Sequence, residues 1–142
     1  MTVITVVLAD DHPIVRKGLR HLLEGDPDFR VVGEAGDGVE TIRLIETLKP
    51  DVLVVDMMMP ELNGLEVLRQ FKKLSPSTRA IVLSMQSANA YVVEALNLGA
   101  EGYVLKETGP GELANAIRTV IQGNRYLSEK LIERLEFAGQ KA

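Results

Sequence analysis

Short apolar runs alternate along the chain with longer segments in which apolar residues recur every three or four positions. The runs span residues 3–9, 30–35, 51–56, 80–84 and 102–105. This alternation is typical of βαβ units, in which helices join buried parallel strands. The pattern predicts an α/β fold, with a five-stranded parallel sheet and helices on both of its faces.

The segments between the runs carry signals for helix ends. Pro13 suits the first turn of the first helix, Pro50 prevents extension of the second, and Gly99 suits the C-cap of the fourth. Five βα units are complete near residue 123, which predicts a doubly wound domain of flavodoxin-like type with strand order 2-1-3-4-5.

Residues 124–142 are predicted to form one more helix, appended to this domain. Ser128 can cap it, and its apolar residues form a narrow stripe of Leu131, Ile132 and Leu135. A short helix of this kind is marginal alone. We therefore expect it to pack on the domain, on a second copy, or on a further part of a longer chain.

Polar residues close several of the predicted strands. Asp10 and Asp11 follow the first run, Asp56 ends the third, Ser84 ends the fourth, and Lys106 follows the fifth. The carboxyl ends of parallel strands share one edge of the sheet, where ligands bind. Three carboxylates crowded there repel one another unless a divalent cation and the lysine neutralise them.

The small acidic set indicates Mg²⁺, which keeps several waters and few protein ligands. We expect Asp11 and Asp56 to be direct carboxylate ligands and Asp10 to bind through water. A main-chain carbonyl just past Asp56, that of Met58, would be the last of the Mg²⁺ ligands that the protein supplies. Taken singly, either member of the Asp10-Asp11 pair could instead cap a helix.

Asp56 has the features of a phosphoryl acceptor. Pro60 and Gly64 mark a rigid turn behind it, which would hold its carboxylate fixed and exposed. A carboxylate can attack phosphorus and form an aspartyl phosphate. The cation would neutralise the transferring group, and Lys106 would contact one of its equatorial oxygens.

Composition limits the other possibilities. The chain has 142 residues, 46% hydrophobic and 25% charged, which suits a single globular domain. It has no cysteine for a disulfide or thiolate metal site, and its net charge of −4 argues against nucleic acid as a direct partner. No apolar stretch reaches membrane-spanning length and no signal peptide is evident, so we expect a cytoplasmic protein with no membrane partner.

The sequence resembles the receiver domain of bacterial two-component response regulators over residues 3–123. The resemblance rests on Asp10-Asp11, Asp56 with Met-Pro and Asn-Gly behind it, Ser84, Tyr103 and Lys106. It implies a receiver domain over residues 1–123, with Mg²⁺-dependent phosphotransfer from the phosphohistidine of a sensor histidine kinase to Asp56. It also implies that Ser84 moves to a phosphoryl oxygen while Tyr103 turns inward.

Residues 83–86, 95–106 and 116–128 are similar to the NarL/FixJ class. In that class residues like 124–142 form a linker helix to a LuxR-type helix-turn-helix domain. No such domain follows before Ala142, so we expect a piece of a longer transcription regulator, or else a stand-alone receiver. The resemblance further implies homodimerisation on phosphorylation, and contact with DNA only through the missing domain. Many receivers place proline directly after the lysine, where this chain has Glu107.

Other functions fit the sequence less well. A Mg²⁺-dependent phosphohydrolase using Asp56 would need a substrate pocket and a dedicated acid–base group. A phosphorylation-independent interaction module is expected to have lost an acidic residue or the lysine. A flavin-binding domain is disfavoured because acidic side chains repel a phosphate that has no metal with it.

Overall fold

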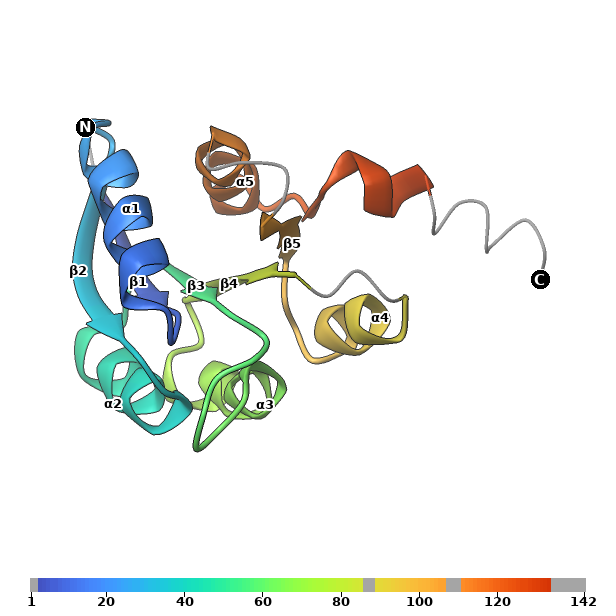
Figure 1. The fold of residues 1–142 in the computed structure, drawn as a ribbon, viewed down its shortest axis with the longest axis horizontal. Helices are drawn as coiled ribbons and strands as arrows, with labels where there is room; N and C mark the ends of the chain where they lie inside the picture. Colours follow the sequence, from blue (N-terminus) through green and yellow to red (C-terminus); the bar gives the residue numbers. More distant parts are fainter. Residues whose placement is uncertain (1–2, 86–88, 107–110, 134–142) are drawn as a thin grey trace.

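The computed structural model describes residues 3–85, 89–106 and 111–133. Figure 1 shows a central sheet with helices on both sides. In chain order the elements are β1 (Ile4–Ala9), α1 (Pro13–Glu24), β2 (Phe29–Ala35), α2 (Gly38–Leu48), β3 (Val52–Val55), α3 (Gly64–Leu74), β4 (Arg79–Ser84), α4 (Asn89–Asn97), β5 (Gly102–Leu105), α5 (Gly111–Ile121) and β6 (Tyr126–Leu127).

The sheet is parallel throughout and has the order β2-β1-β3-β4-β5-β6. The predicted fold class and the order of the first five strands are confirmed. The predicted strand count of five is wrong, because β6 adds a sixth strand beside β5, with Gly102 opposite Tyr126. Two residues are too few to show an alternating pattern, so this strand leaves no signal in the sequence.

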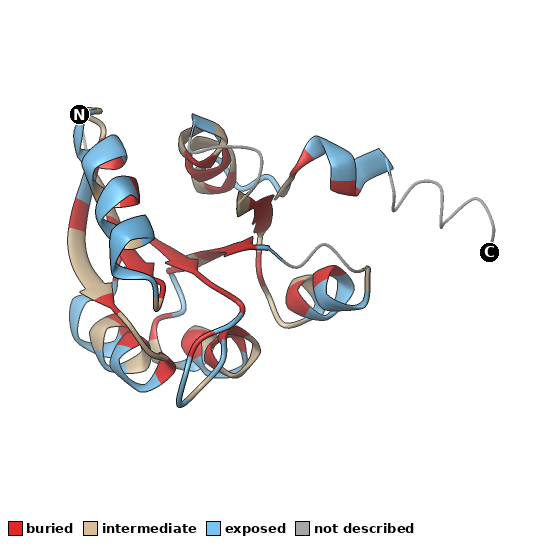
Figure 2. Cartoon of the chain, viewed as in Figure 1, coloured by how far each residue is buried: buried red, intermediate tan, exposed pale blue. Residues whose placement is uncertain are grey.

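The two faces of the sheet carry separate cores. Val6 and Leu8 of β1 pack with Leu19 of α1 and Ile117 of α5. Alternate β1 residues face the other way, into a core formed with α2, α3 and α4. Figures 1 and 2 show this division, with the buried strands between α1 and α5 on one side and the other three helices opposite. Strands buried on both faces place their polar ends at the edges of the sheet.

Local signals end several elements as predicted. Pro13 lies in the first turn of α1, and Gly99 follows α4 with a φ of +108°. Lys49, in the left-handed region with a φ of 44°, ends α2 before Pro50. Gly64 is required by a close approach, since a Cβ there would lie 2.5 Å from the carbonyl oxygen of Asp56. The turn behind Asp56 therefore packs directly on that residue's backbone.

The last described residues of the chain dock on the domain. Residues 129–133 are helical, and Leu131 is fully buried in the core shared with α4. The predicted capping role of Ser128 is not what its hydroxyl does: Oγ bonds to Leu105 and Glu112, while its carbonyl accepts from Leu131 at the helix start. Leu135 and the rest of the predicted linker helix lie outside the described residues. The division at residue 123 stays a prediction, although the sheet continues to Leu127.

Among the described residues, no helix is long and apolar enough to span a membrane.

Candidate functional site

Asp10 and Asp56 are fixed by the backbone at the ends of two neighbouring strands. The amide of Asp10 donates to the carbonyl of Ala35 at 3.0 Å, and that of Asp56 donates to the carbonyl of Ala9 at 2.8 Å. Both residues are almost completely buried, with exposed fractions of 3% and 4%. The sheet ladder thus holds the two carboxylates side by side, as the sequence predicted. The prediction that the Asp56 carboxylate is exposed is wrong, because the end of β3 is covered on both faces of the sheet.

Lys106 supplies a positive charge to both carboxylates. Its Nζ lies 2.8 Å from Asp10 Oδ2 and 3.1 Å from Asp56 Oδ2. The lysine side chain is only 12% exposed. Lys106 is therefore a buried counter-charge and not a solvated lysine at a strand end. Glu107, which replaces the usual proline after this lysine, lies outside the described residues.

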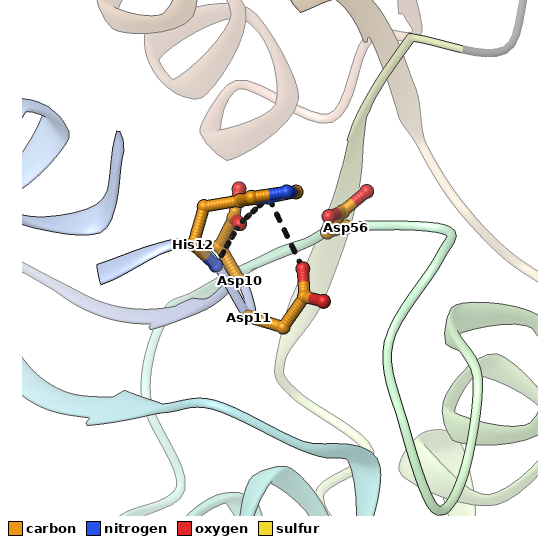
Figure 3. Close-up of side chains that lie close together, drawn as sticks. All are labelled: Asp10, Asp11, His12 and Asp56. Atoms are coloured by element: carbon orange, nitrogen blue, oxygen red, sulfur yellow. Dashed lines mark hydrogen bonds and ion pairs between the residues drawn. The ribbon is translucent and has the colours of Figure 1, made fainter. Parts of the chain in front are cut away.

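Asp11 and His12 complete the acidic cluster (Figure 3). Nδ1 of His12 lies 3.1 Å from an oxygen of Asp10 and 3.1 Å from an oxygen of Asp11. One potential ligand atom from each of these residues and from Asp56 lies within 4.8 Å of the others. The sequence pattern alone does not single out His12, one of only two histidines in the chain. Its position directly after the acidic pair was the available signal, because a chain leaving β1 must cross this edge of the sheet.

The charges at this edge shift the ionisation of its members. Burial, together with the neighbouring charge of Asp10, raises the pKa of Asp56, although the ammonium of Lys106 opposes the shift. Burial would lower the pKa of Lys106, but its hydrogen bond and ion pairs with the two aspartates outweigh this and raise it. Lys106 stays charged, but its ammonium does not fully compensate the negative charge of the Asp56 carboxylate. This edge of the sheet therefore still favours binding of an added cation.

The donor set fits a divalent metal ion. Two buried carboxylate oxygens, Asp10 Oδ2 and Asp11 Oδ1, accept no well-aligned hydrogen bond, although Lys106 and His12 nitrogens lie within ion-pair distance. Buried carboxylate oxygens normally have hydrogen-bond donors or a metal. Oxygen ligands on a compact acidic cluster are those that Mg²⁺ prefers.

Ser84 and Tyr103 lie on the neighbouring strands β4 and β5, two register positions apart. Both are fully buried. Burial raises the pKa of the Tyr103 phenol, while its side-chain hydrogen bond with Ser84 lowers it. The ring of Tyr103 lies inside the core, and its hydroxyl is linked to that of Ser84 at the end of β4.

The turn behind Asp56 is also organised around that residue. The amide of Met58 lies 3.3 Å from Asp56 Oδ1, and the amide of Gly64 donates to the carbonyl of Met57 at 2.9 Å. Glu61 adopts a left-handed conformation, with a φ of 68°. The Met58 side chain is 55% exposed. The main chain of Met58 is thus close to the acceptor carboxylate, while its side chain points away from the core.

Arg16 is a second residue that the sequence did not single out. Its Nη1 donates to the main-chain carbonyl of Asp10 at 2.6 Å, and its Nε donates to Glu34 at 3.1 Å. It therefore ties the end of β1 to β2. The available signal was its place four residues after His12, which puts it on the same side of α1.

A cavity of about 400 Å³ opens beside Lys106 between α1 and α5. It is lined by Ile14, Val15, Gly18, Leu19, Leu83, Met85, Lys106 and Leu113. Apart from the lysine, these side chains offer no acid or base. The cavity does not supply the acid–base group that hydrolysis of an organic phosphate would need.

Comparison with known proteins agrees with this geometry. A family model described as the response regulator receiver domain matches residues 6–118. The nitrate/nitrite response regulator protein NarL of Escherichia coli (strain K12) is 42% identical over 127 residues, which cover 89% of this chain and 59% of that protein. The transcriptional regulatory protein DegU of Brevibacillus brevis is 36% identical over 93% of this chain and 56% of its own length. The chain thus spans less than two thirds of these relatives.

Solved structures are similar over nearly the whole chain. A two-component response regulator of the LuxR family from Aurantimonas sp. SI85-9A1 has a TM-score of 0.90 and 35% identity, covering 99% of both chains. The isolated REC domain of RcsB from Salmonella enterica serovar Typhimurium, solved with the phosphomimetic BeF₃⁻, has a TM-score of 0.86 and 33% identity, covering 93% of this chain and 98% of that one. With the acidic cluster and Lys106 at one edge of this sheet, the chain therefore belongs to the response regulator receiver family, in its NarL and LuxR-type class.

Proposed function

We propose that this chain is a phosphorylation-activated switch in which Asp56 accepts a phosphoryl group from a sensor histidine kinase. The observation that carries the proposal is the convergence of Asp10, Asp11, Asp56 and Lys106 at one buried edge of the sheet. Such a cluster has the acceptor, the cation site and the counter-charge that phosphoryl transfer needs.

The proposed step is a displacement at phosphorus. An Asp56 carboxylate oxygen forms a new O–P bond while the P–N bond of the kinase's phosphohistidine breaks, and the imidazole nitrogen keeps the electron pair. Nζ of Lys106 lies 3.1 Å from the acceptor carboxylate. Its ammonium can therefore pair with a phosphoryl oxygen once negative charge has moved there. Turn residues up to Gly64 keep the acceptor in place.

Asp11, Asp56 and the main-chain oxygen of Met58 are the proposed Mg²⁺ ligands, with Asp10 bound through water. The bound cation would neutralise negative charge on the transferring group. Asp10 lies 2.8 Å from the ammonium of Lys106, and a water-mediated role would leave that ion pair in place.

Ser84 and Tyr103 are the proposed switch pair. Ser84 ends β4 beside the acceptor strand, and its link to the buried Tyr103 crosses from β4 to β5. A serine that turned toward a phosphoryl oxygen would give up or alter that link. The two residues therefore provide a two-state element whose balance phosphorylation can shift.

The whole regulator is proposed to work in the cytoplasm as a homodimer that forms on phosphorylation. Its linker, residues 124–142, would lead to a helix-turn-helix domain that contacts DNA. Support comes from relatives: NarL is named a response regulator, and one RcsB structure of TM-score 0.88 is an RcsB–DNA complex. A phosphorylation-independent interaction module is less favoured, because the acidic residues and the lysine are all in place at this edge.

The test is the intact mass of the chain after incubation with acetyl phosphate, with Mg²⁺ or with EDTA. We expect one phosphoryl adduct that needs Mg²⁺ and is absent in Asp56→Asn. A folded parent chain that takes no adduct would contradict the acceptor role. Loss of many equivalents of donor without an adduct would favour the phosphohydrolase instead.

A further inference from the structure

Ser128 joins the last described residues of the chain to β5, the strand that directly precedes Lys106. Its side chain is fully buried. Its amide donates to the carbonyl of Tyr103 at 3.1 Å, and its Oγ accepts from the amide of Leu105 at 3.0 Å. β6 ends at Leu127, so from this point the serine takes the place of a neighbouring strand for the last residues of β5.

The same hydroxyl reaches the start of the next helix. Ser128 Oγ donates to Glu112, a residue in the first turn of α5. Leu105 directly precedes Lys106, and Glu112 lies six positions after that lysine. One hydroxyl is therefore bonded both to the residue before Lys106 and to the helix that follows it. The hydroxyl hydrogen of Ser128 is donated to Glu112, while the hydroxyl oxygen accepts from the amide of Leu105. The hydroxyl thus acts as donor and acceptor at once.

Ser128 also begins the terminal helix. Its carbonyl accepts from the amides of Leu131 at 2.8 Å and Ile132 at 3.2 Å. Leu131 is fully buried in the core that contains Tyr103. Movement of β5 relative to this helix would therefore break the bonds of Ser128 and disturb the packing of Leu131.

We propose that Ser128 is a positioning residue for Lys106, and that through it the state of the phosphorylation site is passed to the terminal helix. This proposal rests on the proposed function of Asp56. Coupling between two sites is reciprocal in free energy. A phosphoryl group that takes over the pairing of Lys106 from the Asp56 carboxylate shifts Leu105 and hence the Ser128 bonds, and removal of the hydroxyl must in turn weaken binding at the site.

The test uses the full chain with Mg²⁺ and beryllofluoride as the phosphoryl mimic. Hydrogen exchange of the amides in residues 126–132 is measured with and without the mimic, and mimic affinity is measured by titration. Ser128→Ala removes the hydroxyl. Ser75→Ala is the matched control, because Ser75 is also fully buried and bonded through its hydroxyl, to Thr78, but lies in the connection between α3 and β4, away from Lys106.

In the parent chain we expect the mimic to change exchange in residues 126–132. In Ser128→Ala that change should be lost and mimic affinity should fall about three- to tenfold, the effect of one buried hydrogen bond. Ser75→Ala should behave like the parent, and Ser128→Thr, which keeps a hydroxyl, should restore most of the response. Should Ser128→Ala not fold, Glu112→Ala removes one of the two hydroxyl bonds at a partly exposed position and should show the same loss in smaller measure.

A folded Ser128→Ala chain whose terminal amides respond as in the parent would overturn the coupling alone. A parent chain that binds no mimic and takes no adduct from acetyl phosphate would instead overturn the proposed function, and the coupling with it. The two failures are thus separated by the behaviour of the parent chain.

Discussion

The ammonium of Lys106 lies 3.1 Å from Oδ2 of Asp56, a residue 50 positions earlier in the chain. The same ammonium lies 2.8 Å from Asp10. One lysine thus holds together the ends of β1, β3 and β5. In this arrangement the acceptor carboxylate is paired before any phosphoryl group arrives, and the lysine can move its charge from the carboxylate to an incoming oxygen without leaving the edge.

Replacing Lys106 by Met should therefore destabilise the fold. Two buried carboxylates would lose their shared cation, and breaking a buried pair from one side costs about 3 kcal/mol. Urea unfolding at neutral pH measures the loss. Lys17→Met, on the exposed face of α1, is the control and should change little. Equal stability of the two variants would mean that Lys106 is not a structural counter-charge.

Asp56→Asn should stabilise the metal-free chain at neutral pH. The folded pKa of Asp56 is raised, so the folded chain keeps this proton to higher pH than the unfolded chain. The free energy of unfolding therefore falls as the pH rises from the ordinary pKa of an aspartate through the raised pKa of Asp56. The neutral amide removes that loss, and we expect a gain of about 1 kcal/mol above this window. Thermal unfolding from pH 4 to 8 without Mg²⁺ checks it, and a variant less stable than the parent at pH 8 would contradict the assigned burial effect.

Gly64→Ala should disturb the site from behind. Its Cβ would meet the carbonyl oxygen of Asp56 at 2.5 Å and Cα of Met57 at 2.8 Å, so the backbone must shift. We expect a loss of about 2 kcal/mol and much slower labelling of Asp56 by acetyl phosphate. Gly18→Ala is the matched control: nothing lies within 4 Å of its Cβ, and in the middle of α1 alanine should stabilise by about 0.5–1 kcal/mol. Normal labelling of Gly64→Ala would show that the turn does not position the acceptor.

The sequence predicted the parts of the molecule that repeat or that carry charge at strand ends. Buried strands on both faces give continuous apolar runs, so five strands and their order could be inferred. The acidic residues and Lys106 could be placed together because parallel strands end at one edge. Contacts that depend on side-chain reach could not be inferred in this way. Arg16 on Asp10, His12 between two aspartates, and Ser128 on Leu105 each depend on the angle at which one element leaves the sheet.

Arg16 gives the most direct test of whether residues that do not contact the metal help to orient the metal site. It does not touch the acceptor, but it donates to the carbonyl of Asp10 at 2.6 Å and is itself held by Glu34. Groups that orient metal ligands from behind typically change metal affinity by about 10- to 100-fold when removed. Arg16→Ala should therefore weaken Mg²⁺ binding at least about tenfold, measured by isothermal titration calorimetry, while circular dichroism shows the fold intact.

Arg20→Ala separates this effect from the loss of charge. Arg20 also pairs with Glu34 but is more exposed, and its described contacts are with Glu34 and Glu24, not with Asp10. Both variants remove one positive charge from α1, so a general electrostatic effect would change Mg²⁺ affinity equally in the two. A selective loss in Arg16→Ala would show that the hydrogen bond to the Asp10 carbonyl orients the metal site. Equal affinities in Arg16→Ala and the parent would remove Arg16 from it.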